Sequence, residues 1–308
     1  MQDETTPAAA AAAQPPQDDG AATRGFVYAL SAYLMWGTLT LYMKAVSHIP
    51  AVEVVVHRVL WSVPVAGAVL LAMGRTADIK AALRSPRTLA MAALTATIIS
   101  GNWAIYIWAI AVERTVEAAL GYYINPLMTV LLGAVLLGER LDRVQWLAVG
   151  LAAVAVVVLT VDAGGLPWIP LVLAVTFAVY GFLRKTLPIG AIQGFFLEVL
   201  LLTPPCLVWL AWLETTGRGH FLGGSAWDVA LLLAAGPITA VPLILYGLGA
   251  KLLRFSTIGL MQYISPTIIV LIAVFVFGEP FGAARMVAFC LIWLALALYT
   301  WSILFRRW

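Results

Sequence analysis

Long apolar stretches follow one another along almost the whole chain, and they constrain its fold more than any other feature. Ten such stretches of about 20 residues are separated by short breaks that hold charged residues, glycine or proline. About 20 apolar residues span a bilayer as a helix, and helices satisfy their own backbone hydrogen bonds in lipid. Only 11% of the residues are charged, against about a quarter in soluble domains. The sequence predicts an all-α integral membrane protein.

Ten transmembrane helices are predicted, an even number that returns both termini to one side. The connections on that side hold 13 of the 18 Lys and Arg residues, and cytoplasmic loops are the basic ones. We therefore expect a multi-pass protein of the cell inner membrane with both termini in the cytoplasm. The predicted helices span roughly 25–46, 51–73, 88–111, 115–137, 143–162, 167–186, 190–213, 227–250, 256–278 and 283–305.

Two stretches 140 residues apart repeat one another. GYYINPLMTVLLGAVLLGE begins at Gly121 and MQYISPTIIVLIAVFVFGE at Met261, and they share seven of nineteen letters. The offset covers five predicted helices, so a tandem copy enters the membrane in the opposite direction. Basic residues in corresponding connections reverse accordingly, with four after the second helix and one after the seventh. The sequence predicts a 5+5 inverted-topology repeat, with units at 24–163 and 164–308.

The remaining composition excludes several other classes of protein. Residues 1–23, rich in Ala, Pro, Gln and acidic residues, are interpreted as a disordered tail. Cys206 and Cys290 lie inside apolar runs, which does not favour a disulfide or a metal site. No basic run with interleaved aromatic residues indicates nucleic acid. No GxxxxGK[ST] motif is present, so ATP hydrolysis by this chain is not expected.

Several motifs together resemble a known family. SAYLMWGTLTLYMK, HRVLWS, GNWAIYIWA, EAALGYYINPL, LGERL and QYISPT are similar to the RarD branch of the EamA-type transporters, in the drug/metabolite transporter superfamily. The resemblance runs from Arg24 to the C-terminus. It implies ten helices arranged as five plus five inverted, an inner-membrane permease, and a central cavity between the halves. It indicates architecture more firmly than substrate.

Charged residues inside predicted helices are the first candidates for substrate contact, because each costs about 2.5–3.5 kcal/mol at a helix centre. Arg58 lies in the second helix, and Glu198 occupies the equivalent place in the seventh. Arg58 is expected to bind an anionic group such as a carboxylate, and Glu198 an amine or a coupling proton. The two could instead form a structural salt bridge, or Arg58 could reach the headgroups. His57, next to Arg58, is interpreted as a structural histidine or a proton relay.

Polar and aromatic residues of the third predicted helix form a second group of candidates. An amide inside the bilayer requires a partner, so Asn102 should face protein or cavity water. Trp103 and Tyr106, near the middle of the helix, could line a pocket for a planar or amphipathic solute. The alternative is an interfacial belt of aromatic residues, which is the preferred interpretation for Trp residues near helix ends.

Prolines and their neighbours recur at equivalent places in the fourth and ninth predicted helices. A proline inside a helix leaves a backbone carbonyl one turn earlier without its bond, and neighbouring polar side chains can satisfy it or contact substrate. Pro126 and Pro266 are the expected kinks. Glu139 and Glu279, at the ends of these helices, are expected to pair with surface arginines. The candidate polar neighbours are Tyr123, Asn125, Gln262 and Tyr263.

An inverted repeat gives two halves that can exchange conformations across an axis in the membrane plane. We therefore predict a secondary transporter that moves a small organic metabolite or drug by alternating access. The alternative is a non-transporting membrane receptor or accessory subunit that binds a small molecule. No nucleophile–base pair or cluster of metal ligands is visible, so no enzyme, cofactor or metal is expected. The expected partners are a small-molecule substrate, a candidate coupling proton and the lipid bilayer, with the monomer as the functional unit.

Overall fold

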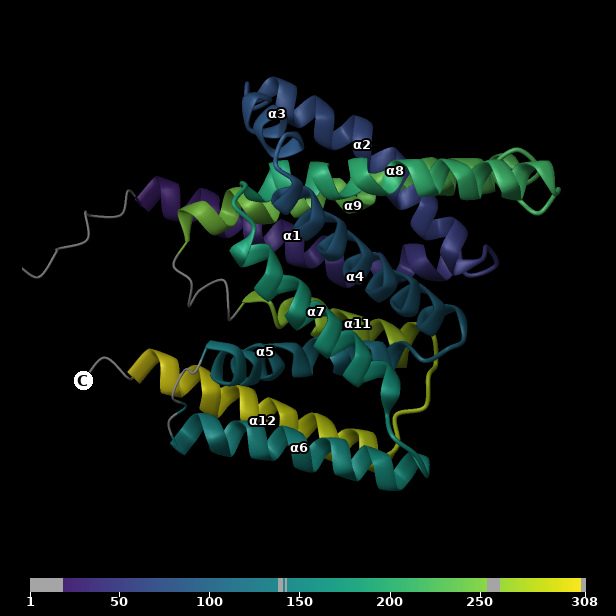
Figure 1. The fold of residues 1–308 in the computed structure, drawn as a ribbon. Helices are drawn as coiled ribbons and strands as arrows, with labels where there is room; N and C mark the ends of the chain where they lie inside the picture. The colour runs from purple at the N-terminus through teal and green to yellow at the C-terminus, as the bar shows by residue number, and fades with distance from the viewer. Residues whose placement is uncertain (1–18, 138–140, 142, 254–260, 306–308) are drawn as a thin grey trace, which may run out of the picture.

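The protein is a bundle of helices (Figure 1). The computed structural model describes residues 19–137, 141, 143–253 and 261–305, and within these ranges no strand occurs. Most of the N-terminal tail, residues 1–18, therefore lies outside the described residues. The helices are α1 (Asp19–Ala45), α2 (Ala51–Ala72), α3 (Ala77–Leu83), α4 (Pro86–Ala111), α5 (Thr115–Leu137), α6 (Arg143–Ala163), α7 (Trp168–Thr186), α8 (Ala191–Thr215), α9 (Ala226–Leu252), α11 (Ile264–Leu271), the π-helix η1 (Ile272–Val276) and α12 (Ala283–Phe305).

These helices confirm the prediction of an all-α membrane protein. Among the described residues, seven helices are long and apolar enough to cross a bilayer, and two apolar helices are shorter. Each of the ten predicted ranges overlaps a helix. The chain is more finely divided than predicted, however, because α3 adds a short helix and the range 256–278 contains both α11 and η1.

Local sequence explains the break that contains α3. Gly74 has a φ of 65° just after the end of α2, a conformation that suits glycine because it has no Cβ. Ser85 then begins α4, since its Oγ accepts a hydrogen bond from the Thr88 backbone nitrogen at 3.3 Å. Pro86 follows at the first helical position, where its missing N–H is not needed. α3 therefore lies between a glycine stop and a serine–proline start.

The two predicted proline kinks differ in the structure. Pro126 lies inside α5, which continues from Thr115 to Leu137. Pro266 instead lies in the first turn of α11, and Gln262 and Tyr263 before it form a turn. A proline cannot donate to the carbonyl four residues earlier, which here belongs to Gln262. The second proline therefore accompanies a break in the helix rather than a bend within it.

Most of the extensive helix pairings join the first half of the chain, α1–α6, to the second, α7–α12. α6 packs on α12 and α5 on α7, while α1 packs on α9 and α11. α2 packs on α8 and α9, and α4 on α7 and α8. Figure 1 shows α6 and α12 side by side at one edge of the bundle and α2, α8 and α9 toward the opposite edge. The two halves are thus interleaved.

Among the described residues, Glu279 does not form the predicted surface pair with an arginine. Its side chain is buried, and its two carboxylate oxygens accept hydrogen bonds from the backbone nitrogens of Thr115 at 2.8 Å and Val116 at 3.0 Å. These nitrogens belong to the first turn of α5, where a helix favours negative charge. The prediction was wrong because it considered only the helix that precedes Glu279. Glu139 lies outside the described residues.

Replacing Glu279 with alanine is therefore expected to destabilise the protein. Two hydrogen bonds that the backbone nitrogens at the start of α5 donate to the charged carboxylate would be lost, and each such bond contributes about 1.5–3 kcal/mol. Thermal unfolding of the purified protein in detergent should show a clear fall in melting temperature. Glu113→Gln is the matched control, because Glu113 is 76% exposed and pairs only with Lys44 among the described ion pairs. Equal melting temperatures for the two variants would contradict this assignment.

Candidate substrate site

Arg58 lies in α2 and is almost fully buried, with 4% of its surface exposed. Its Nε donates a hydrogen bond to Thr239 Oγ1 in α9 at 3.0 Å. The guanidinium lies over the Trp103 ring in α4, with 4.4 Å between the guanidinium carbon and the ring centroid. A cation at this distance from an indole face is attracted by the ring. Arg58 therefore reaches the protein interior and does not extend to the headgroups.

Tyrosines rather than carboxylates surround the Arg58 charge. Tyr42, Tyr106 and Tyr122 lie within electrostatic range of the guanidinium. Among the described residues, no acidic group forms an ion pair with Arg58, and Arg58 Nη1 and the Tyr106 hydroxyl have no hydrogen bond of normal geometry. A buried cation without a counterion is costly. This place in the bundle is thus suited to an anionic group supplied from outside the chain.

Glu198 lies in α8 and pairs with Arg184 rather than with Arg58. Its Oε1 lies 3.5 Å from Arg184 Nε in α7 and accepts a hydrogen bond from Thr95 Oγ1 in α4 at 2.7 Å. Tyr180 donates to Oε2 at 3.2 Å. The structure therefore contains no Arg58–Glu198 salt bridge among its described residues, and the two charges occupy separate positions.

A line of aromatic rings connects the two charged positions. Tyr106 and Tyr122 have ring centroids 5.5 Å apart, Tyr122 and Phe177 5.9 Å, and Phe177 and Tyr180 6.1 Å. The first two rings lie close to Arg58, and Tyr180 donates to Glu198. The rings come from α4, α5 and α7. They form a continuous series of edge-to-face and tilted ring contacts between the buried cation and the buried carboxylate.

His57 and Asn102 lie at the edges of this region. The Nδ1 atom of His57 accepts a hydrogen bond from Trp61 Nε1 at 3.0 Å, and its ring lies 4.9 Å from that of Phe221. Asn102 donates from Nδ2 to Leu173 O at 3.0 Å and to Thr176 Oγ1 at 2.8 Å. Asn102 therefore faces protein as predicted, and its amide joins α4 to α7.

The remaining candidates are not gathered around Arg58. Tyr123 lies in another part of the core, where its hydroxyl is hydrogen-bonded to Thr267 and its ring packs against Phe289. Tyr123 and Tyr263 line a cleft of about 370 Å³ between α5, α11 and α12. Asn125 and Gln262 are only partly buried. Of the four residues named as neighbours of the prolines, only Tyr123 and Tyr263 therefore line this cleft.

Several residues of the site were not predicted. Thr239, Tyr42 and Tyr122 carry no charge, and nothing in the sequence distinguishes them from other residues of apolar helices. Arg184 lies near the end of the predicted helix 167–186 and was counted with the basic residues of the connection that follows it. A signal was nevertheless present, since Tyr180 and Arg184 are four residues apart and therefore lie on one face of a helix.

The chain is similar to known transporters. Residues 23–161 match the model of the EamA-like transporter family. The chain is 42% identical over 280 residues to "Protein RarD" of Streptomyces exfoliatus, covering 91% of this chain and 89% of that protein. It is 39% identical over 285 residues to "Protein RarD" of Escherichia coli (strain K12), covering 92% and 96%.

A further relative and a solved structure extend these similarities. The chain is 37% identical over 282 residues to "Uncharacterized transporter YojE" of Bacillus subtilis (strain 168), covering 91% of this chain and 94% of that protein. A crystal structure with 23% sequence identity superposes with a TM-score of 0.56 over 94% of this chain and 98% of the other, which shows a shared fold. The chain belongs to the EamA-like transporter family and is a permease of its RarD type.

Proposed function

We propose that this permease is a secondary transporter that moves a small organic solute with an anionic group by alternating access. The observation that carries the proposal is Arg58, a buried cation that faces tyrosines and has no acidic partner among the described residues. A carboxylate of the solute would supply the missing charge and hydrogen bonds. The ring of Trp103 and the aromatic line toward Glu198 would accommodate a planar or amphipathic body.

The direction of equivalent helices supports an inverted 5+5 repeat. α2 and α8 are equivalent at the offset of 140 residues. Glu53 at the start of α2 bonds to His220 beyond the end of α8, and Gln193 at the start of α8 bonds to Asp78 beyond the end of α2. The two helices therefore run antiparallel. α5 and α11–η1 do likewise, since Glu279 beyond η1 binds the first turn of α5.

The helix pairings support the same repeat. At the offset of 140 residues, α1 is equivalent to α7, α2 to α8, α4 to α9, α5 to α11 and α6 to α12. Exchanging equivalent helices converts the α1–α9 pairing into α7–α4, the α1–α11 pairing into α7–α5, and the α2–α9 pairing into α8–α4. The α2–α8, α5–α11 and α6–α12 pairings convert into themselves. All of these pairings occur. This is the arrangement expected of two units related by an axis in the membrane plane.

The two buried charged residues, Arg58 and Glu198, are related by the same exchange of equivalent helices. Arg58 in α2 is bonded to Thr239 in α9, and Glu198 in α8 is bonded to Thr95 in α4. α2 is equivalent to α8, and α9 to α4. Each charge therefore has a hydroxyl partner on the corresponding helix of the other half. In a rocking motion the two positions would be exposed alternately to opposite sides of the membrane.

Orientation and assembly complete the proposal. We propose that the termini are cytoplasmic and the membrane is the inner one, because 13 of the 18 basic residues lie in the connections on the terminal side or in the helix ends that border them, and cytoplasmic loops are the basic ones. Arg58, Trp103 and Thr239 all come from one chain. A monomer therefore contains the whole proposed site.

Counterflow in proteoliposomes tests the transport function. Vesicles that contain the purified protein and an unlabelled aromatic carboxylate should accumulate the same labelled compound from outside, and a panel of carboxylates and amines would define the preference. Accumulation that requires the protein supports a carrier. Saturable binding without accumulation would instead favour the alternative of a receptor or accessory subunit.

Glu198→Gln is expected to reduce counterflow strongly while the protein still inserts and purifies. The substitution keeps the size of the side chain but removes the charge that Arg184 and Tyr180 contact. Glu214→Gln, at the end of the same helix, is the matched control. Flux in the two variants should be compared at equal amounts of inserted protein. Unchanged flux in Glu198→Gln would remove this residue from the proposed transport pathway.

A further inference from the structure

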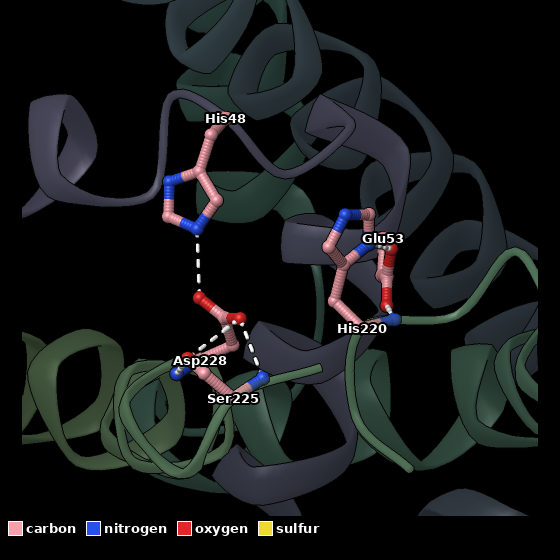
Figure 2. A network of polar contacts seen from close by, with 5 residues as sticks. All are labelled: His48, Glu53, His220, Ser225 and Asp228. Carbon is pink, nitrogen blue, oxygen red and sulfur yellow. Dashed lines mark hydrogen bonds and ion pairs between the residues drawn. The ribbon is translucent and has the colours of Figure 1, made fainter. Parts of the chain in front are cut away.

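Two histidine–carboxylate pairs join the two halves at one end of the bundle (Figure 2). His48 Nε2 lies 2.7 Å from Asp228 Oδ1. His220 Nδ1 lies 2.8 Å from Glu53 Oε2, and the His220 backbone nitrogen donates to Glu53 Oε1 at 2.7 Å. His48 and Glu53 belong to the first half of the chain, and His220 and Asp228 to the second. Each half thus supplies one histidine and one acid.

The acids of these pairs are enclosed and the imidazoles are open to solvent. The Glu53 side chain is 0% exposed and that of Asp228 12%, whereas the His48 and His220 side chains are 51% and 31% exposed. The other oxygen of Asp228 accepts hydrogen bonds from the backbone and side chain of Ser225 at the start of α9. Protons can therefore reach the histidines from water while the carboxylates remain fixed.

Other charged groups nearby are engaged elsewhere. Lys44 at the end of α1 pairs with Glu113 at 3.3 Å. Glu214 at the end of α8 accepts from the Leu222 backbone nitrogen at 3.3 Å. Arg218 lies over the Trp212 ring at 5.5 Å. Inward from Glu53, His57 is bonded to Trp61. The two acids therefore have the two histidines as their closest cationic partners among the described residues.

The opposite end of the bundle has a related contact that does not titrate in the same way. Gln193, which is equivalent to Glu53 in the repeat, donates from Nε2 to Asp78 Oδ2 at 3.0 Å. An amide is neutral at every physiological pH, whereas an imidazole changes charge between about pH 5 and 8. Of these two contacts, only the one between Glu53 in α2 and His220 beyond the end of α8 contains an imidazole that can gain a proton.

We propose that the two histidine–carboxylate pairs form a proton-controlled gate between the halves of the permease. Protonated imidazoles neutralise the enclosed carboxylates and hold this end closed. As the pH rises and the imidazoles lose their charge, Glu53 becomes a buried acid without a counterion, which favours separation and hydration. Closure is thus favoured while the imidazoles carry a proton and is lost when they release it. The inference rests on the proposed alternating access.

Distances between two spin labels test the gate without any transported solute. Labels at Ser47→Cys and Leu222→Cys, in a background of Cys206→Ala and Cys290→Ala, report the separation of the two loops. Between pH 8 and pH 6 the ratio of short to long distances should rise about tenfold, because each partly exposed ion pair contributes up to about a fivefold change. The double variant His48→Gln/His220→Gln should show no pH dependence, whereas Arg218→Gln should retain it.

A second variant guards against misfolding of the first. Glu53→Gln/Asp228→Asn keeps the side-chain shapes and a capping side chain at position 228, and it should also abolish the response to pH. Identical distance distributions at pH 8 and pH 6 in the otherwise unsubstituted protein would overturn the proposal, as would an undiminished response in the double histidine variant. Failure of counterflow would not alter this result, so the gate and the transport function are tested separately.

Discussion

Arg58→Ala is expected to abolish counterflow while the protein remains as stable as the unsubstituted form or becomes more stable. The side chain contributes a hydrogen bond to Thr239 and a contact with Trp103. Against these stands the cost of a buried cation, about 2.5–3.5 kcal/mol at a helix centre. A residue that contributes little net stability but is required for flux would bind substrate. If Arg58 were needed for folding, its substitution would lower both the stability and the flux.

Arg58→Lys provides the sharper form of this experiment. Lysine keeps the positive charge but lacks the planar fork that can donate to Thr239 and to a carboxylate while lying flat on Trp103. Loss of one hydrogen bond to a charged group costs about 1.5–3 kcal/mol. The apparent affinity for the solute should therefore fall by about 10- to 100-fold, and high solute concentration should partly restore the flux.

Melting temperature and flux must be measured on the same preparations, with Arg218→Gln as the control for removal of a cation from the loop after α8. A large fall in melting temperature for Arg58→Ala would indicate a structural residue. Full flux in both Arg58 variants would exclude the proposed site. The expected pattern is loss of flux without loss of stability in Arg58→Ala and partial flux in Arg58→Lys.

The parts of this molecule that could be predicted from sequence are those with a strong local signal. The membrane helices could be predicted because apolar runs of about 20 residues have few alternatives in lipid. Arg58 and Glu198 could be identified because a charge is conspicuous inside such a run. α3 could not, because its seven residues are too few to show a periodic pattern.

Partners in the site could not be predicted, because they come from distant parts of the chain. Thr239 follows Arg58 by 181 residues, and a threonine in an apolar helix has no unusual cost that would mark it. Glu279 illustrates the same limit, since the helix terminus that it binds belongs to residues 163 and 164 positions earlier. The presence of a charged side chain inside a helix could be predicted from the local sequence. Its hydrogen-bond partner could not, because the partner depends on which helices pack against each other.

Gly236→Ala is expected to separate α9 from α2 and to lower both stability and flux. A Cβ at position 236 would overlap the backbone carbonyl carbon and oxygen of Trp61. Backbone atoms of a packed helix cannot move aside as a flexible side chain can, so the helices must shift. Overpacking of this kind costs about 1–3 kcal/mol. Small residues at such places let helices approach closely in lipid.

Gly247→Ala is the matched control on the same helix. No atom lies within 4 Å of a Cβ at position 247, and alanine is favoured over glycine in a helix interior by about 0.8–1 kcal/mol. The two substitutions add the same methyl group to α9, yet their effects on melting temperature should have opposite signs. A similar change of melting temperature in both variants would mean that the effect comes from helix propensity, and the close α2–α9 contact would then not limit stability.

Because α2 carries Arg58 and α9 carries Thr239, the displacement of the helices caused by Gly236→Ala should also weaken solute binding, whereas Gly247→Ala should leave solute binding unchanged.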